Sequence, residues 1–416
     1  MRLVTRLDAE DLSGLDDQEL LDRARELMHA VGALMPSRFG IVMRGTVTEQ
    51  IARLLLGWAV GRRRAGGLHI DLMADIPCVT TAANADLERI AATVRSTPEL
   101  REVYLAEEPA DIAGRLRGSA PGRALLDEVD AHLSRYGFRE MSIITVGLPP
   151  LRDAPWIVHG IIKGLARLKE NPHRKTGDRL AHGRSELASE RGLRARLLRR
   201  VIVRTLDSAR AGTGFREDSY YLIVMSLAVT RRILLEFGRR LVERGILADA
   251  DDIAYLELDE LGALSPPGPR QIVERRRTAR AASLDHYTAV PAEFLGPNDG
   301  DDRVHGTPAS RGKFVGPVRV IHDETEFATL EAGEVLVCPY TNPIWTPLFS
   351  VAGAVVVDSG GAASHAAIVA REHGIPAIMG TANGTRILTD GQRVLVDADR
   401  GIVTPIGAGD MANAPV

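Results

Sequence analysis

Cysteine and aromatic residues are scarce in this sequence. Only Cys78 and Cys338 occur among the 416 residues, and two distant cysteines indicate neither a disulfide framework nor a metal cluster. Because free cysteines are typical of a reducing compartment, we expect a cytoplasmic protein. Aromatic residues make up 4% of the chain, which argues against a surface that stacks nucleic-acid bases.

The sequence also lacks a large excess of one charge and a long apolar run. The formal net charge is -3 with 26% charged residues, which argues against a polyanionic partner such as nucleic acid. The N-terminal residues MRLVTRLDAEDLSGL contain no apolar core of a secretory signal, and no uncharged run approaches membrane-spanning length. We therefore expect a soluble protein with no membrane or nucleic-acid partner.

What the chain does contain is enough apolar sequence for two or three domains. Apolar residues make up 45% of the chain, and residues 1–265 follow helical periodicity almost throughout. The predicted helices in this part are 16–34, 46–61, 84–94, 122–136, 154–168, 191–208 and 220–245. Ser13 or Asp16 is the expected N-cap of the first helix. Because no fixed period recurs, we expect an irregular helical domain and not a solenoid.

Residues 266–304 are predicted to connect this helical domain to the rest of the chain. They contain a basic helix at 270–287 and a flexible glycine and proline segment at 296–300. The arginine run 275–277 is compatible with nucleic-acid binding, but we interpret it as one solvated helix face.

The C-terminal part, residues 305–406, predicts a compact α/β domain of short strands alternating with helices. The predicted strands are 318–322, 334–339, 354–357, 377–380, 393–397 and 402–405. The predicted helices are 324–330, a segment around 345–351, and 364–373. Residues 407–416 are expected to form a disordered tail.

Residues 359–380, SGGAASHAAIVAREHGIPAIMG, hold the strongest candidate for chemistry. An apolar run at 355–357 predicts a buried strand that ends in the glycine pair Gly360 and Gly361. A glycine turn directly after a strand permits a close approach of the backbone to a ligand.

A helix is predicted to start directly after this turn. Ser364 is its expected N-cap, and Gly374 is its expected left-handed C-cap. His365 would lie in the first helical turn, where free N–H groups and the helix dipole favour an anion. An imidazole in that position can attack a phosphoryl group and carry it as phosphohistidine. Taken alone, however, His365 is better interpreted as an ordinary residue at a helix start, because a lone histidine after a glycine turn is a weak signal.

The longer string GG-x-x-SH-x-AIVARE-x-GIPA resembles the active-site motif of a known family. This is the phosphohistidine swivelling domain of phosphoenolpyruvate synthase, pyruvate phosphate dikinase and rifampicin phosphotransferase. The match continues in register through residues 307–310, 316–320, 345–349, 390–391 and 401–403. The resemblance implies a β/β/α swivelling fold for residues 305–406, with His365 as the phosphoryl carrier.

Other residues near the histidine receive roles from the same resemblance. Gly360, Gly361 and Ser364 would form the loop around the phosphate. Thr346 either shapes the neighbouring strand end or donates a hydrogen bond to the phosphoryl group. Arg371 either reaches the phosphate or pairs with a local carboxylate.

The helical part resembles, more loosely, the substrate-binding domain of rifampicin phosphotransferase-like proteins. The resemblance implies that Arg139, Arg216 and Glu217 face the incoming phosphohistidine on the acceptor side. Arginine and glutamate pairs at helix ends are often only structural, so this alternative stays open. The segment at 214–217 is expected to open the long helix.

Two departures from that family pattern affect the expected acceptor. Phe138 stands where rifampicin phosphotransferases have a histidine, and Glu140 replaces the glycine that follows. Asp218, Ser219 and Tyr220 stand where a lysine is expected. Because a missing lysine removes a charge that would steer a phosphate, rifampicin itself is a doubtful acceptor.

These observations lead to one main functional hypothesis. His365 would receive the β-phosphoryl group of ATP from an ATP-grasp partner that binds ATP and Mg²⁺, and would pass it to a hydroxyl of a small organic acceptor. No cofactor and no metal are expected in this chain itself, which contains no GxxxxGK[ST] loop and no recognisable ATP-grasp or TIM-barrel segment.

The sequence leaves two alternatives open. One is a degenerate, non-catalytic binding or regulatory protein that keeps the scaffold. The other uses phosphoenolpyruvate as donor through a separate barrel protein.

Overall fold

The computed structural model describes residues 1–139, 149–168, 179–263, 268–287, 303–361 and 364–406. Its contacts divide the chain into two compact units. The first unit contains Met1–Gly40, Phe138–Asp153 and Asp218–Phe294. The second unit contains Ile41–Gly137, Ala154–Glu217 and Leu295–Val416. The two longest helices, α2 and α10, contribute to both units.

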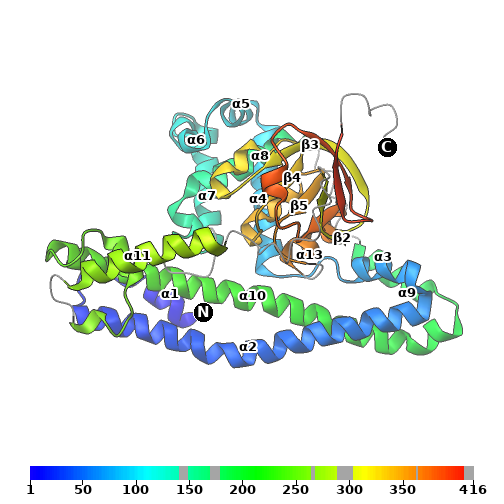
Figure 1. Ribbon diagram of the computed structural model, residues 1–416, viewed down its shortest axis with the longest axis horizontal. Helices are drawn as coiled ribbons and strands as arrows, with labels where there is room; N and C mark the ends of the chain where they lie inside the picture. Colours follow the sequence, from blue (N-terminus) through cyan, green and yellow to red (C-terminus); the bar gives the residue numbers. More distant parts are fainter. Residues whose placement is uncertain (140–148, 169–178, 264–267, 288–302, 362–363, 407–416) are drawn as a thin grey trace. The chain divides into compact units, whose positions relative to one another are not determined.

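The described residues up to 287 are mainly helical, as the sequence predicts, and are followed by a mixed sheet (Figure 1). The longer helices are α1 Arg2–Asp8, α2 Asp17–Val60, α3 Arg62–Leu72, α4 Val79–Ser96, α5 Pro98–Ala106, α6 Pro109–Leu116, α7 Ala120–Tyr136, α8 Pro155–Arg167, α9 Arg179–Ser189, α10 Leu193–Glu243 and α11 Gly268–Tyr287. Short 3₁₀ helices occur at Leu151–Asp153, Ala250–Tyr255 and Leu261–Ala263. No described helix combines the length and the apolarity that crossing a membrane requires.

Two pairs of predicted helices are each one continuous helix, which corrects the predicted ends. Residues 16–34 and 46–61 both lie in α2, which contains Pro36, and residues 191–208 and 220–245 both lie in α10. Asp16 is the N-cap of α2, because its carboxylate accepts the Glu19 N–H at 2.8 Å while the Glu19 carboxylate accepts the Asp16 N–H at 2.8 Å.

Glycines in the middle of these helices allow the helices to touch. A Cβ on Gly45 of α2 would lie 2.9 Å from the Gly212 Cα of α10, which is closer than packed atoms approach. Figure 1 shows the two helices running side by side there. Gly45 and Gly212 therefore allow α2 and α10 to pack closely within the second unit.

A Gly45→Ala variant is expected to lose stability because the new methyl group would push α2 and α10 apart. We expect the free energy of unfolding to fall by about 1–3 kcal/mol. Gly57→Ala is the matched control, since no atom lies within 4 Å of its added Cβ. The control should gain about 1 kcal/mol from helix propensity. Chemical denaturation of both variants measures the difference. Equal changes in the free energy of unfolding would show that the contact between α2 and α10 tolerates a side chain.

Helix α8 contributes a buried histidine to the second unit. His159 is 2% exposed, and its Nδ1 lies 2.8 Å from the Tyr104 hydroxyl. Burial lowers the pKa of His159 from 6.5 to about 4, so the ring is neutral in the folded protein near neutral pH.

Between pH 6.5 and about 4, His159 is therefore protonated in the unfolded chain but neutral in the folded chain. We expect the unfolding free energy to fall by about 3 kcal/mol as the pH drops through this window, on account of His159 alone. A His159→Gln variant should lose that part of the pH dependence, whereas His29→Gln, at an exposed position, should keep it. Unchanged acid sensitivity of His159→Gln in denaturation experiments would contradict this account.

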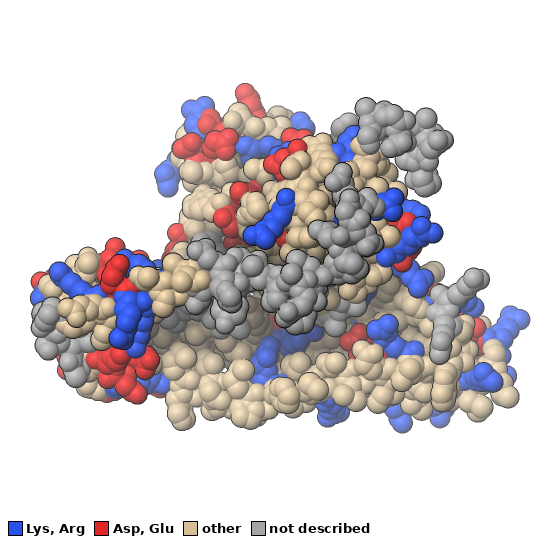
Figure 2. Space-filling view, viewed as in Figure 1, with Lys and Arg blue, Asp and Glu red and all other residues tan. Residues whose placement is uncertain are grey.

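The α11 arginines bind acidic side chains of the first unit. Arg276 pairs with Glu260 at 2.6 Å, and Arg277 pairs with Asp252 and lies over the Tyr255 ring. At the left of Figure 2, basic and acidic side chains lie side by side around this helix. The hinge predicted at 296–300 lies outside the described residues.

The eight-stranded sheet of the second unit is mixed. The strands are β1 Val304–His305, β2 Thr307–Ser310, β3 Lys313–Val320, β4 Val335–Cys338, β5 Ala354–Val357, β6 Ala377–Met379, β7 Arg393–Asp397 and β8 Ile402–Pro405. Their order is β1-β8-β7-β3-β4-β5-β6-β2. The neighbours from β3 to β6 are parallel, and the other pairs are antiparallel. All six predicted strands are present, whereas β1 and β2 were missed.

Shorter helices surround this sheet. They are α12 Thr346–Phe349, α13 His365–His373, α14 Gly384–Ile387, and short 3₁₀ helices at Glu324–Thr329 and Pro343–Trp345. Every residue of β4, β5 and β6 is buried, as expected for parallel strands covered on both faces. Because β4, β5 and β6 are parallel, their carboxyl ends lie along one edge of the sheet, where α/β proteins bind ligands.

Candidate functional site

The loop that follows β5 is fixed by an aspartate. The Asp358 carboxylate accepts the Thr381 hydroxyl at 2.7 Å and the Thr385 hydroxyl at 2.5 Å. The Asp358 N–H donates to the Cys338 carbonyl at the end of β4. These bonds hold together the loops that leave three neighbouring parallel strands.

The backbone requires glycine at Gly360 in this loop and at Gly380 in the loop after β6. Gly360 has φ 85°, in the left-handed region, and a Cβ there would lie 3.0 Å from the Ser364 Cβ. Gly380, after β6, has φ 67°, and a Cβ there would lie 2.8 Å from the Gly360 carbonyl oxygen. The Gly361 carbonyl accepts the Ser364 N–H at 2.9 Å, which leads the chain into the next helix.

His365 is the first residue of α13, as predicted. The Ser364 side chain caps the helix by accepting the Ala367 N–H at 3.3 Å, and Gly374 ends it in the left-handed conformation, φ 67°. Both predicted caps are confirmed. The half-buried imidazole of His365 lies at the positive end of a nine-residue helix, where a negative charge is stabilised.

Thr346 lies next to this imidazole. Its hydroxyl oxygen is 3.3 Å from His365 Nε2, and its side chain is buried. Either atom can donate, depending on the imidazole tautomer. The sequence placed Thr346 beside the His365 loop, and the structure brings the two side chains into contact.

A buried polar cluster holds Thr346 in place. The preceding residue, Trp345, is fully buried and donates its indole N–H to Glu324 at 3.0 Å, and the Asn342 amide donates to the same carboxylate at 3.2 Å. Burial raises the pKa of Glu324, and these two hydrogen bonds oppose that change. The cluster therefore fixes the start of α12 against the sheet domain.

The two roles expected for Arg371, on α13, stay predictions. Its Nε donates to the Ala309 carbonyl of β2 at 2.7 Å. Desolvation lowers the pKa of its guanidinium first of all, and the charge of Arg53 adds to this effect. This bond holds α13 against β2 at the edge of the sheet.

The acceptor-side residues do not all belong to one unit. Arg139 lies in the first unit, is 7% exposed, and accepts the Leu151 N–H with its carbonyl. Arg216 and Glu217 lie in the second unit and form an ion pair at 3.0 Å. Glu217 also accepts the Thr80 hydroxyl at 3.2 Å.

The expectation that residues 214–217 open the long helix is wrong, because they lie in the middle of α10. Gly214 faces the backbone of Pro77, where an added Cβ would lie 3.3 Å from the carbonyl oxygen. The glycine therefore provides close packing and not a helix start. Phe138, the residue at the family's histidine position, is buried under the Arg152 guanidinium at 4.3 Å.

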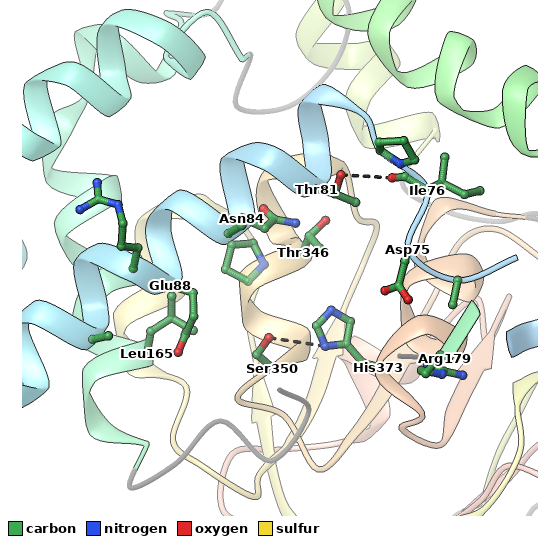
Figure 3. A pocket seen from close by; sticks show the side chains of 16 residues that line it. Asp75, Ile76, Thr81, Asn84, Glu88, Leu165, Arg179, Thr346, Ser350 and His373 are labelled. Atoms are coloured by element: carbon green, nitrogen blue, oxygen red, sulfur yellow. Dashed lines mark hydrogen bonds between the residues drawn. The ribbon is translucent and has the colours of Figure 1, made fainter. Parts of the chain in front are cut away.

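A pocket of about 670 Å³ lies beside Thr346 within the second unit (Figure 3). On one side it is lined by Thr81, Asn84 and Glu88 of α4. On another side it is lined by Thr346 and by His373, whose Nδ1 lies 3.4 Å from the Ser350 hydroxyl. His365 is not among the lining residues, but Thr346 belongs to both the pocket wall and the His365 site.

Sequence reasoning missed this pocket. Its α4 residues form the polar face of an amphipathic helix, which is also what a solvated helix surface looks like. Within the described ranges, no group of three or more His, Cys, Asp or Glu side chains is arranged to hold a metal ion.

Two family models match separate parts of the chain. Residues 330–401 match the mobile domain of phosphoenolpyruvate-utilising enzymes, and residues 36–217 match the fourth domain of rifampicin phosphotransferase. The first match contains β4, β5, β6 and α13. The second contains α4, which lines one side of the pocket, and the Arg216–Glu217 pair.

Curated relatives agree with both models. Rifampicin phosphotransferase of a Streptomyces species is 32% identical over 352 residues, which is 78% of this chain and 40% of that protein. Chondramide synthase cmdD of Chondromyces crocatus is 32% identical over 375 residues, 80% of this chain and 10% of that protein. Phosphoenolpyruvate synthase of Aeropyrum pernix is 42% identical over 142 residues, 34% of this chain and 17% of that protein. The chain thus spans well under half of each of these relatives.

Proposed function

Because this chain belongs to the family of phosphoenolpyruvate-utilising enzymes that includes rifampicin phosphotransferase, we propose that it is a phosphotransferase whose His365 carries the phosphoryl group. The position of the imidazole supports this proposal most strongly. It lies at a helix N-terminus and at the carboxyl ends of parallel strands, and its Nε2 lies beside the Thr346 hydroxyl. Free N–H groups and a neighbouring hydroxyl are the donors that a phosphoryl group requires.

The proposed donor is ATP, bound with Mg²⁺ by an ATP-grasp partner. His365 Nε2 attacks the β-phosphorus, AMP leaves, and the histidine carries a pyrophosphoryl group. Water then cleaves the terminal phosphate, which leaves phosphohistidine and inorganic phosphate. Positioning and charge neutralisation account for most catalysis in such steps.

In the second half of the proposed reaction, a hydroxyl oxygen of a small organic acceptor bonds to phosphorus as the bond from phosphorus to Nε2 breaks. The electron pair of that bond returns to the imidazole, and the hydroxyl proton passes to a base. Glu217 is our candidate for this base, and Arg216, which holds its carboxylate, would orient it. Arg139 is our third candidate on the acceptor side.

The source of the phosphoryl group separates this mechanism from simpler ones. The protein is incubated with β-³²P-labelled or γ-³²P-labelled ATP, with and without an ATP-grasp partner, and acid-labile label is measured. We expect stable label only from the β position and only with the partner. Label from the γ position alone would contradict the dikinase chemistry. Label from phosphoenolpyruvate, transferred through a barrel protein, would show that phosphoenolpyruvate and not ATP is the donor.

The alternative of a non-catalytic binding protein has one observation in its favour. Phe138 replaces the family's histidine and is built into the first unit by its stacking with Arg152. If His365 takes no label from ATP or phosphoenolpyruvate with any partner while the protein binds a ligand, this alternative takes the place of the main proposal.

A Thr346→Val variant tests the hydroxyl beside the histidine. Valine keeps the shape of threonine and removes the oxygen that lies 3.3 Å from Nε2. We expect His365 to be labelled about tenfold more slowly, which corresponds to one lost hydrogen bond to a charged group. Rapid-quench labelling measures this rate, and Thr329→Val, an exchange elsewhere in the same domain, is the control. An unchanged rate would limit Thr346 to a packing role.

A further inference from the structure

The pocket beside Thr346 contains two oxygen atoms that lack a hydrogen-bond donor. Asn84 Oδ1 and Glu88 Oε2 are both buried without a partner in the described structure. The two residues are one helical turn apart on α4, and both line the pocket (Figure 3). Because the terminal torsions of Asn and Glu are soft, a small rotation would turn either oxygen toward a bound donor. Buried acceptors of this kind call for a partner.

A third oxygen group faces the same pocket from the turn after α3. Asp75 has φ 55°, a left-handed conformation that is uncommon for a residue with a side chain. The Arg210 guanidinium holds this turn by donating to the backbone carbonyls of Leu72, Ala74 and Asp75. The Asp75 side chain is among those that line the pocket (Figure 3). The Arg210 hydrogen bonds therefore fix the backbone from which the Asp75 side chain extends.

The cationic side chains of the pocket are bound to carboxylates. Arg89 pairs with Asp86 at 2.9 Å and with Glu128 at 2.6 Å. Arg179 pairs with Asp71 at 3.1 Å.

Glu88 itself uses only one oxygen for an ion pair, with Arg95 at 2.6 Å. Counted over these lining residues and their ion-pair partners, carboxylates outnumber guanidinium groups. The local charge therefore favours a cation over an anion.

From this juxtaposition of Asp75, Asn84 and Glu88 we infer that the pocket binds a ligand with a protonated amine. An ammonium group donates three hydrogen bonds and accepts none, which fits three oxygen acceptors. This inference rests on the proposed function in one respect: the same ligand is the phosphoryl acceptor, and its hydroxyl lies at Thr346.

Thr346 connects the pocket wall with His365, so an acceptor held by its amine at α4 would present the rest of its structure toward the histidine. A pocket of about 670 Å³ is large enough for a ligand well above monosaccharide size. We therefore expect a compound that bears both an amine and a hydroxyl group, and not a compound that is recognised through apolar contacts alone.

Two disaccharides of the same skeleton test this ligand class directly. The β-1,4-linked dimer of glucosamine carries two amines, and cellobiose carries hydroxyl groups at the same positions. Binding of each to the whole protein is measured by titration calorimetry, without ATP or any partner, while the amines are protonated. We expect the diamine to bind at least about tenfold more tightly than cellobiose. Equal affinities, or no binding of the diamine, would overturn the inference.

Three variants show whether binding takes place in this pocket. Glu88→Gln removes the charge, and Asn84→Leu removes the amide oxygen at similar volume. Each should weaken binding of the diamine about tenfold, whereas Glu102→Gln, an exposed carboxylate outside the pocket, should not. Thermal unfolding of each variant confirms that it is folded. Equal weakening by all three, or by none, would contradict the assignment.

The two proposals can fail separately. Label on His365 together with failure of the diamine to bind would reject the amine class and keep the phosphotransferase. Tight, Glu88-dependent binding without any label on His365 would keep the pocket and reject its role as the acceptor site.

Discussion

A His365→Gln variant is expected to carry no acid-labile phosphate under conditions that label the unaltered protein. Glutamine has no imidazole nitrogen that can attack phosphorus, and nothing else in the His365 loop is a nucleophile of the same kind. The expected loss is at least about 10³-fold, because removal of a covalent nucleophile removes the whole pathway. Labelling with β-³²P ATP and an ATP-grasp partner measures it.

The control for this variant is His322→Gln in the same sheet domain. His322 is exposed and follows β3, outside the loop that holds His365. This control should keep its label, and both variants should unfold at the temperature of the unaltered protein. If His365→Gln is labelled as well as the control, the phosphoryl group is carried by another residue.

A Trp345→Ala variant is expected to cause the largest loss of stability in the sheet domain. The indole is fully buried and packs edge-on against Phe327, with 4.9 Å between the ring centroids. Its N–H donates to the Glu324 carboxylate. Truncation leaves a cavity and removes one of the two hydrogen bonds that the buried Glu324 carboxylate receives from side chains. We expect the free energy of unfolding to fall by about 4 kcal/mol.

The same variant should also slow the labelling of His365, because Trp345 precedes Thr346 and fixes the start of α12. Denaturant titration and labelling rates measure the two effects. Trp58→Ala is the matched control, since that indole is 72% exposed and its loss removes little packing. A cost below about 1 kcal/mol for Trp345→Ala would show that the cluster with Glu324 is not a stabilising core.

The local pattern of the sheet domain was readable from the sequence because its strands are short and buried. Runs such as 354–357 are bounded by glycine or proline, and a β-strand is the structure that fits such a run. β1 and β2 were missed because they are short and lie at the two edges of the sheet. Pro308 and a register shift interrupt the pairing of β2 with β6, which removes the alternation that predicts a strand.

The long helices show the opposite case, in which local signals mislead. Pro36, Gly45 and Gly212 each lower helix propensity, and they lie in the gaps between the predicted helices. In the folded chain the two glycines lie where α2 and α10 touch, and this contact between distant segments keeps both helices continuous. Propensity contains no information about such a contact.

The His365 loop was predictable because its glycines, its cap and its histidine are adjacent in sequence. The pocket was not, since its residues come from α4, from the turn after α3 and from α12, and only the fold brings them together. The roles of Arg139, Arg216 and Glu217 stay predictions. The domain limits at 265 and 305 also stay predictions.

The position of the phosphate on the protein tests the central proposal most directly. The protein is phosphorylated from ATP with an ATP-grasp partner, kept at alkaline pH, digested, and mapped by mass spectrometry with fragmentation that preserves the bond from phosphorus to nitrogen. We predict one phosphate, on the imidazole of His365 in the peptide that contains Gly360 and Gly361. Phosphate on a different residue, or none under conditions that phosphorylate a relative of the same family, would contradict His365 as the phosphoryl carrier.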